Sequence, residues 1–494
     1  MQKVVLSIFA FALIAANVAV AEEDDRYVPE TDSQVLQKLE QWQDLKFGLL
    51  MHWGAYCQWG IVESWSICPE DYGWCERREG ENPQDYFAYK REYENLKTTF
   101  DPGEFDPAPW AAAAADAGMR YVVFTTKHHD GFCMFDTEST DYKITDMECP
   151  HHDHAQADVT AAIFSAFRDQ GLWAGAYFSK PDWHHENYWH PYFPPRDRNV
   201  NYDPEVYPDR WEGFVQFTHT QIMELMSNYG QVDILWLDGG WVAKKSPEDI
   251  RGWYGGWVDE TTSGFFKRNI VNQDIRMDEL VAKARKQQPG LIVVDRAVPG
   301  KNQNYLTPEN RVPEAALSYP WESCIIAGGS WSWVPDAQYM SVRKTVHLLV
   351  DIVAKGGNLL LNIAPSPQGT WDDGAYDLLE GIGDWMAVNA EAIYGTRALA
   401  PYKAGRVCLT HGRDSGVVHA IYLADEGEMS PPAVIDIPGV KAEVGAKVTM
   451  LGIEGELAWS DGEQGLRVSI PNQVRAEPPC ADAWVVRISG VVVE

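Results

Sequence analysis

Six short apolar runs in this chain are each followed directly by residues that could do chemistry. The residues that follow these runs are His52-Trp53-Gly54, Lys127-His128-His129-Asp130-Gly131, Tyr177-Phe178-Ser179, Asp238-Gly239-Gly240-Trp241, Asp295-Arg296 and Asn362. Imidazole and carboxyl groups can transfer protons or act as nucleophiles, and indole rings can stack on a flat ligand. Since six such coincidences in register are hard to dismiss, we expect these side chains to surround one ligand.

The runs themselves have the length and continuity of strands that are buried on both faces of a parallel sheet. They cover residues 46–51, 121–125, 172–176, 232–237, 291–294 and 358–361. Helical patterns lie between them, at 109–117, 161–170, 211–228 and 277–288, and most end at a glycine. This alternation predicts an α/β fold, a (β/α)8-like TIM barrel over residues 22–395, in which function gathers at the carboxyl ends of the strands.

The pattern changes after Thr396. Strand-like runs at 417–423, 433–437, 447–451, 465–470 and 483–488 are separated by glycine, proline and acidic turns, with no long helix between them. Such spacing is typical of antiparallel sheets. We therefore expect a C-terminal antiparallel β-sandwich over residues 396–494.

The amino terminus resembles a secretory signal. Residues 1–21 combine an early lysine, an apolar run and the small-residue pattern Ala19-Val20-Ala21 before acidic residues. We expect this segment to be cleaved, so that the protein is secreted or periplasmic and has no membrane anchor. The 8 cysteines would then lie in an oxidising compartment. Cys57, Cys68 and Cys75 are close enough in sequence to share one loop, but spacing alone leaves the pairing of the cysteines open.

The overall charge excludes two kinds of partner. The formal net charge is −31, which would repel nucleic acid and anionic membranes. The chain also contains 21 Trp, a weak indication of carbohydrate, because indole rings stack on the apolar faces of sugars. We expect a carbohydrate substrate, and the sequence does not indicate an oligomeric state.

Five motifs, in this order, closely resemble those of glycoside hydrolase family 29, the α-L-fucosidases. They are HWG, FTTKHHDGFCMFDT, WLDGGW, VVDR and GGNLLLNIAP, and the similarity covers nearly the whole mature chain. The resemblance implies a retaining hydrolase with Asp238 as the nucleophile. It further implies that five residues contact the sugar, namely His52, His128, His129, Tyr177 and Arg296, and that Trp53 and Trp236 lie near the ring.

Retention requires a second carboxyl group about 5–5.5 Å from the nucleophile to act as acid and base. In the resembled family this group comes from a variable loop after the VVDR strand, where Glu309 and Glu322 both qualify. We favour Glu309, because a loop residue can approach the leaving group from outside. Glu322 could instead bind the ring or orient Asp238, and Trp321, which precedes it, is a further candidate sugar contact.

Substrate choice depends on a segment that departs from the resembled family. Glu63-Ser64-Trp65 stands where many relatives have Glu-Trp-Tyr, so Glu63 and Trp65 are candidate sugar contacts, and Trp331 is a candidate wall of the entrance. An α-L-galactoside, which differs from a fucoside by one 6-hydroxyl, therefore remains an alternative substrate. A non-hydrolytic carbohydrate-binding protein is a further alternative, although the presence of Asp238 argues against it.

Two other chemistries are not favoured. His128-His129-Asp130 and His151-His152-Asp153-His154 contain metal-ligand types, but the first belongs to the sugar-binding motif and the second lies in an acidic, solvated loop. We expect no metal and no cofactor. Ser64 and Ser179 have no adjacent base, and the G-x-S-x-G turn of serine hydrolases does not occur in the sequence.

Overall fold

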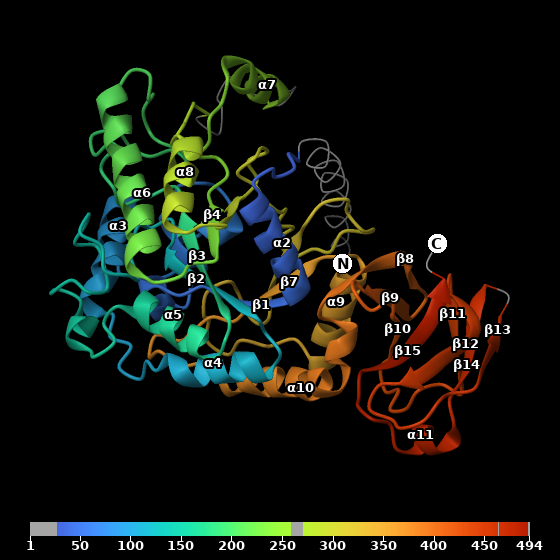
Figure 1. Cartoon of the computed structure of the whole chain (residues 1–494). Helices are drawn as coiled ribbons and strands as arrows, with labels where there is room; N and C mark the ends of the chain where they lie inside the picture. The colour runs from blue at the N-terminus through green and yellow to red at the C-terminus, as the bar shows by residue number, and fades with distance from the viewer. Residues whose placement is uncertain (1–26, 258–269, 463, 493–494) are drawn as a thin grey trace, which may run out of the picture.

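The protein is described here by a computed structural model of residues 27–257, 270–462 and 464–492 (Figure 1). The expected signal segment, residues 1–21, lies outside the described residues. Within these ranges no helix combines the length and apolar character that crossing a bilayer requires. The chain forms a helix-covered parallel sheet, followed by a separate group of antiparallel strands beside helices α9 and α10 (Figure 1).

Seven parallel strands form the sheet, in the order β5-β4-β3-β2-β1-β7-β6. They are β1 (Phe47–Met51), β2 (Tyr121–Lys127), β3 (Trp173–Ser179), β4 (Ile234–Asp238), β5 (Ile292–Asp295), β6 (Glu322–Ile326) and β7 (Asn358–Asn362). All six apolar runs are strands, as predicted, and β6 is an additional one. Their mutual register, for example Gly48 opposite Tyr121, brings their carboxyl ends to one edge.

An irregular segment occupies the position of an eighth strand. Between β5 and β6 the described residues show no ladder, and residues 302–310 lie there instead. The segment bonds to β5 through the Asn304 N–H and the Val293 carbonyl (2.9 Å) and to β6 through the Glu322 N–H and the Leu306 carbonyl (2.8 Å). Pro308 has no N–H to donate to a ladder, which disfavours a regular strand here. The predicted barrel architecture is confirmed, and its wall consists of seven strands and this irregular segment.

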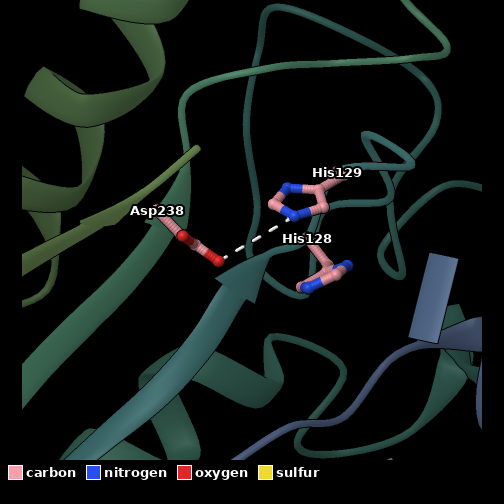
Figure 2. A group of neighbouring side chains, drawn as sticks. All are labelled: His128, His129 and Asp238. Atoms are coloured by element: carbon pink, nitrogen blue, oxygen red, sulfur yellow. Dashed lines mark ion pairs between the residues drawn. The ribbon is translucent and has the colours of Figure 1, made fainter. Parts of the chain in front are cut away.

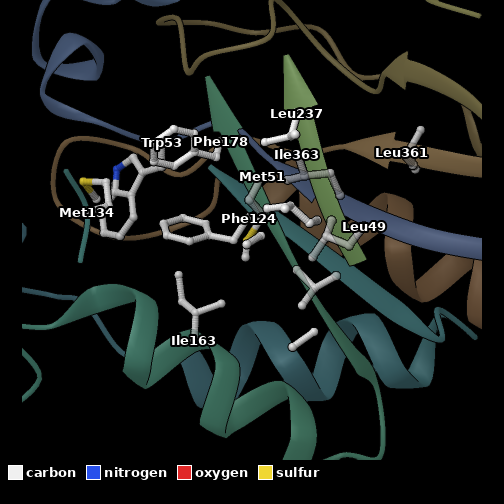
Figure 3. Close-up of a cluster of buried hydrophobic side chains, with 14 of the residues drawn as sticks. Leu49, Met51, Trp53, Phe124, Met134, Ile163, Phe178, Leu237, Leu361 and Ile363 are labelled. Carbon is white, nitrogen blue, oxygen red and sulfur yellow. The ribbon is translucent and has the colours of Figure 1, made fainter. Parts of the chain in front are cut away.

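Strand residues alternate between two apolar environments. Leu50, Val123 and Trp236 point into a cluster inside the barrel. Their neighbours Leu49, Phe124 and others pack outward against the helices, where they belong to the main core (Figure 3). Because both faces are buried, the strands read as continuous hydrophobic runs.

The helices begin and end at the expected kinds of residue. The Asp106 side chain caps the helix that starts at Pro107, and Gly118 follows its end with a φ of 87°, a conformation that glycine adopts without strain. The helices are α2 (Ser33–Leu45), α3 (Tyr86–Glu94), α4 (Pro107–Asp116), α5 (Val159–Asp169), α6 (Pro208–Asn228), α7 (Pro247–Trp257), α8 (Met277–Gln287), α9 (Val342–Ala354), α10 (Asp373–Asn389) and α11 (Asn472–Ala476). Short 3-10 helices are η1 (Ala55–Trp59), η2 (Glu63–Ile67), η3 (Gly73–Cys75), η4 (Asn95–Thr99), η5 (Pro150–Asp153) and η6 (Ala390–Ala392).

The C-terminal strands form two antiparallel sheets, in the orders β12-β15-β10-β9-β8 and β11-β14-β13. The strands are β8 (Thr396–Ala404), β9 (Val407–Gly412), β10 (Val418–Leu423), β11 (Val434–Pro438), β12 (Lys441–Met450), β13 (Trp459–Asp461), β14 (Gly465–Ser469) and β15 (Ala483–Val492). Leu409 and Val486 of the first sheet share one core with Ile435 and Val468 of the second. The predicted β-sandwich is thus confirmed.

Candidate active site

A small chamber opens at the carboxyl ends of the barrel strands. Its volume is about 160 Å³, and it adjoins an outer cavity of about 620 Å³. At roughly 30 Å³ per water molecule the inner chamber has room for a single sugar ring and little more. The inner chamber is lined by Leu50, His52, Glu63, Trp65, His128, Tyr177, Arg198, Trp236, Asp238, Trp241, Arg296, Glu309, Cys324 and Trp331. Residues at or just after the ends of β1, β2, β3, β4 and β5 therefore meet around one space, whereas Asn362, at the end of β7, is not part of the lining.

Asp238, the last residue of β4, is held by donors on both carboxylate oxygens. Its Oδ2 accepts a hydrogen bond from the Tyr177 hydroxyl (2.8 Å), and its Oδ1 accepts from the Gly239 N–H (2.7 Å) and from Arg296 Nη1 (3.2 Å). Burial would raise the pKa of this carboxyl, but the charge of Arg296, the His129 ring and these donors together lower it well below its usual range. Asp238 is therefore ionised at neutral pH.

Arg296 also contacts a second carboxylate. Its Nη2 binds Oε2 of Glu309, which lies on the irregular segment beside β6 and is 43% exposed. The guanidinium is stacked over the Trp236 ring at 5.3 Å. Asp238 and Glu309 thus bind the two terminal nitrogens of one planar group, which makes their carboxyl groups neighbours. A retaining mechanism needs such a pair of neighbouring carboxyl groups.

Three buried histidines, His52, His128 and His129, lie near Asp238, and Figure 2 shows the last two of them. His129 Nε2 lies 3.8 Å from Asp238 Oδ2, beyond a hydrogen bond. Burial lowers the pKa of His52 to about 4 and that of His129 to about 3, and it lowers the pKa of His128 well below its usual value. At neutral pH all three rings are uncharged, so they can exchange hydrogen bonds with hydroxyl groups without adding charge to the chamber.

The orientation of two of these rings is set by polar partners. His52 Nδ1 pairs with the Asn362 side-chain oxygen (2.9 Å), which makes this nitrogen the donor and leaves Nε2 as an acceptor. His128 Nδ1 lies 2.5 Å from the Ser64 hydroxyl. Ser64 is fully buried and is not part of the chamber lining. It therefore positions His128 and does not face a ligand.

Glu63 is a third acidic group in the inner chamber. Its side chain is 1% exposed, and Oε1 has no hydrogen-bond partner among the described residues. Burial, followed by the charges of Glu309 and Asp238, raises the pKa of Glu63 well above its usual range. At neutral pH this carboxyl is protonated, so it can donate a hydrogen bond to a ligand.

Sequence reasoning missed Arg198, which lies on the loop after β3. Its Nε and Nη2 bind the two carboxylate oxygens of Glu70 at 2.7 and 2.5 Å. The guanidinium lies over the Trp65 ring at 4.6 Å and over the Trp241 ring at 5.1 Å, and it lines both cavities. Several other chamber residues were found because each follows an apolar strand. Arg198 lies in a long loop and follows no such run, so this pattern could not identify it.

Four expected residues are not part of the chamber lining, namely Trp53, Trp321, Glu322 and His129, the last of which lies beside Asp238. Trp53 packs on the outer side of the barrel against Trp110 and Phe105, and its Nε1 donates to the Ser366 carbonyl (3.0 Å). Trp321 is buried with its ring against Gly357. Both rings are covered by protein, so the expectation that Trp53 and Trp321 contact the sugar is corrected.

Glu322 is the third of these residues. It opens β6, at the amino end of the barrel, and accepts hydrogen bonds from the Tyr121 hydroxyl (2.6 Å) and from Trp236 Nε1 (3.3 Å). Burial raises the pKa of Glu322 to about 7. Since Trp236 stands between Glu322 and the chamber, the expectation that Glu322 acts on a leaving group or binds the ring is corrected: it supports Trp236 from beneath.

One group of side chains has the composition of a metal site. The ligating atoms of His128, His129 and Asp238 lie within 4.8 Å of one another. The Arg296 guanidinium, which is bonded to Asp238, opposes the binding of a second cation there. The donor set fits a hydroxylated neutral ligand better than a metal ion.

The chain is similar to known proteins over nearly its full length. Residues 14–391 match the family model described as alpha-L-fucosidase, and residues 405–489 match that of the alpha-L-fucosidase C-terminal domain. Human tissue alpha-L-fucosidase is 26% identical over 505 residues, which cover 98% of this chain and 97% of that protein.

Two solved structures extend the likeness. Alpha-L-fucosidase isoenzyme 1 from Paenibacillus thiaminolyticus has a TM-score of 0.71 and 26% identity, covering 92% of this chain and 99% of its own. A trapped covalent intermediate of a Bacteroides thetaiotaomicron alpha-L-fucosidase has a TM-score of 0.69 and 20% identity, covering 94% of this chain and 98% of its own. At this identity the likeness is one of fold.

Proposed function

The chain belongs to the α-L-fucosidase family, and from this premise we propose that it is a retaining exo-glycosidase that removes terminal α-L-fucosyl residues from glycans by double displacement. One observation carries the proposal: a buried, ionised Asp238 shares the guanidinium of Arg296 with a second carboxylate at the mouth of a chamber of monosaccharide size. We further propose that the signal-like segment directs the enzyme out of the cell.

Asp238 acts as the nucleophile. Its low pKa keeps it ionised, and the backbone N–H of Gly239 and the Tyr177 hydroxyl fix the carboxylate in place. One oxygen attacks the anomeric carbon and displaces the aglycone, which leaves a covalent glycosyl ester. A covalent intermediate has been trapped in the Bacteroides alpha-L-fucosidase, and this supports the proposal by analogy.

Glu309 acts as acid and then as base. Its carboxylate is paired with Arg296, the form that a general base needs when water attacks the ester in the second step. For the first step it must carry a proton to the leaving oxygen, so it has to separate from Arg296 when substrate binds. Its place on an irregular, partly exposed segment between two cavities supports both the movement and the approach to the aglycone.

The uncharged groups of the chamber bind the ring. His52 and His128 exchange hydrogen bonds with the hydroxyls, and the protonated Glu63 donates one. Trp236, which stacks on Tyr177 at 5.2 Å, and Trp331, whose ring lies 5.2 Å from that of His52, supply apolar walls. Neutral partners suit a neutral sugar, since a charged chamber would cost desolvation energy on closure.

An α-L-galactoside is the second candidate substrate. The observation that favours it is the unpartnered Oε1 of Glu63 inside the chamber, which the extra 6-hydroxyl of L-galactose could satisfy. A site that hydrogen-bonds such a hydroxyl discriminates strongly against an analogue that lacks it. The methyl group of L-fucose would instead favour the Trp65 ring.

Parallel turnover of p-nitrophenyl α-L-fucoside and α-L-galactoside tests the proposal. We expect hydrolysis of the fucoside, with the α-anomer of the free sugar as the first product detected by proton NMR. Release of the β-anomer would contradict retention. Binding of L-fucose without turnover of either glycoside would favour the non-hydrolytic carbohydrate-binding alternative.

A further inference from the structure

Two cysteines lie together behind the wall of the chamber. Cys68 directly follows η2, and Cys75 is the last residue of η3. The Cys68 N–H donates to the Trp65 carbonyl and the Cys75 N–H to the Tyr72 carbonyl, both at 2.9 Å. The two short helices pack against each other, and both cysteine side chains are buried in the same core.

The two thiols are direct neighbours. Burial raises the pKa of the Cys68 thiol well above its usual value, and contact with the Cys75 thiol and the charge of Glu70 raise it further. Both sulfur atoms also lie close to Arg198. In contrast, four other thiols point at backbone carbonyls, namely those of Cys133, Cys149, Cys324 and Cys480.

We propose that Cys68 and Cys75 form a disulfide in the exported enzyme. The S–S bond forms as the two thiols lose two protons and two electrons. The electrons and protons pass to a disulfide oxidant, either a thiol–disulfide oxidoreductase or an oxidised small-molecule thiol, which becomes a dithiol. Disulfides form and persist in secretory and periplasmic compartments, to which the signal-like segment would direct this chain.

The bond would position the chamber wall through Glu70, which lies inside the closed loop. Glu70 holds Arg198 by two hydrogen bonds, and Arg198 lies over Trp65 and Trp241, which line the inner chamber. Closing the short loop restricts the positions that Glu70 can take. This consequence rests on the proposed glycosidase function, whereas the bond itself does not.

Peptide mapping tests the bond directly. The exported protein is unfolded without reductant, alkylated, and cleaved after glutamate, which separates Cys68 from Cys75 at Glu70. We expect the two peptides to remain joined, with a mass about two hydrogens below their sum, and to separate on reduction. Alkylation of both thiols before reduction, or a bond from either to another cysteine, would overturn the proposal.

Kinetics and thermal unfolding test the positioning role. A phosphine reductant should raise KM for the aryl fucoside several-fold in the wild type, change kcat less, and lower Tm. The double variant Cys68→Ser/Cys75→Ser should show the raised KM from the start and no response to reductant. Cys57→Ser is the matched control, because Cys57 is a buried neighbour in the same region, and it should respond as the wild type does.

An equal response of the double variant to reductant would overturn the positioning role. If the enzyme turns over neither glycoside, the proposed function fails while the peptide map still decides the disulfide. If the double variant does not fold, the map and the effect of reductant on the wild type still decide the two statements.

Discussion

Arg296 Nη1 lies 3.2 Å from Asp238 Oδ1, and the same guanidinium binds Glu309 through its other terminal nitrogen. One side chain thus stabilises the negative charge of both carboxylates in the resting enzyme. In the proposed mechanism Asp238 becomes an ester and loses its charge, so that Arg296 then interacts with Glu309 alone. The same mechanism uses Glu309 first as an acid and then as a base, which requires the strength of this contact to change along the reaction.

Replacing the proposed nucleophile should abolish turnover without unfolding the protein. In Asp238→Asn the amide oxygen can still accept from Tyr177, but a neutral amide is a poor nucleophile. We expect kcat to fall about a thousandfold or more. Azide should partly restore turnover and yield a β-glycosyl azide. Near-normal turnover, with Tm unchanged, would rule out this role for Asp238.

The loss of rate on removing the proposed acid, Glu309, should depend on the leaving group of the substrate. Glu309→Ala should slow fucosides of poorly acidic alcohols by about a hundredfold or more, and activated aryl fucosides far less, because the latter need little protonation. Glu322→Gln serves as the comparison, since Glu322 lies beneath Trp236 and outside the chamber. A plot of log kcat/KM against leaving-group pKa that steepens only for Glu322→Gln would reverse the two assignments.

Glu322 should make stability depend on pH. Burial raises the pKa of Glu322 from 4.5 to about 7, so between these values the folded state binds more protons than the unfolded state. Its contribution to the free energy of unfolding is therefore fully present below the unfolded pKa and is lost as the pH rises through about 7.

The loss should be at most about 3 kcal/mol between about pH 5 and about pH 8. Glu322→Gln, whose amide does not ionise, should lack this component. Urea unfolding of both proteins at the two pH values measures the difference. The same pH dependence in the variant would assign the effect to another group.

Ser64 and Glu63 should affect substrate binding in different ways. Ser64→Ala removes the partner of His128 Nδ1, and we expect kcat/KM to fall by about tenfold for fucoside and galactoside alike, a loss of about 1.4 kcal/mol. The ratio between the two substrates should stay constant. A changed ratio would mean that Ser64, although buried, contributes to the recognition of the substituent at the 6-position of the sugar.

Glu63→Val should change the ratio. If the carboxyl faces the 6-position, the variant loses the group that a 6-hydroxyl could satisfy, and the galactoside-to-fucoside ratio of kcat/KM should fall roughly ten- to a hundredfold. Glu63→Gln keeps a neutral hydrogen-bonding group and is the matched control, with a smaller expected change. A constant ratio in both variants would place the selectivity elsewhere.

The local pattern of the sequence determined the strands and several of the chamber residues. Continuous apolar runs mark strands that are covered on both faces, and the residue after such a run lies at the carboxyl end of its strand. Asp238, His128 and Arg296 could be found in this way. Capping aspartates and terminal glycines likewise mark the ends of some helices, such as α4.

Only the tertiary structure decided which side of a run faces the ligand. When both faces of a strand are apolar, the alternation that would separate inside from outside is absent, so the sequence cannot show that Trp53 packs outward while Trp236 points inward. Glu322 was misplaced for a related reason: it opens its strand instead of following it. The contacts of Arg198 with Glu70 and of Arg296 with Glu309 join separate loops, and no local pattern encodes them, because they exist only after the barrel has brought those loops to one end.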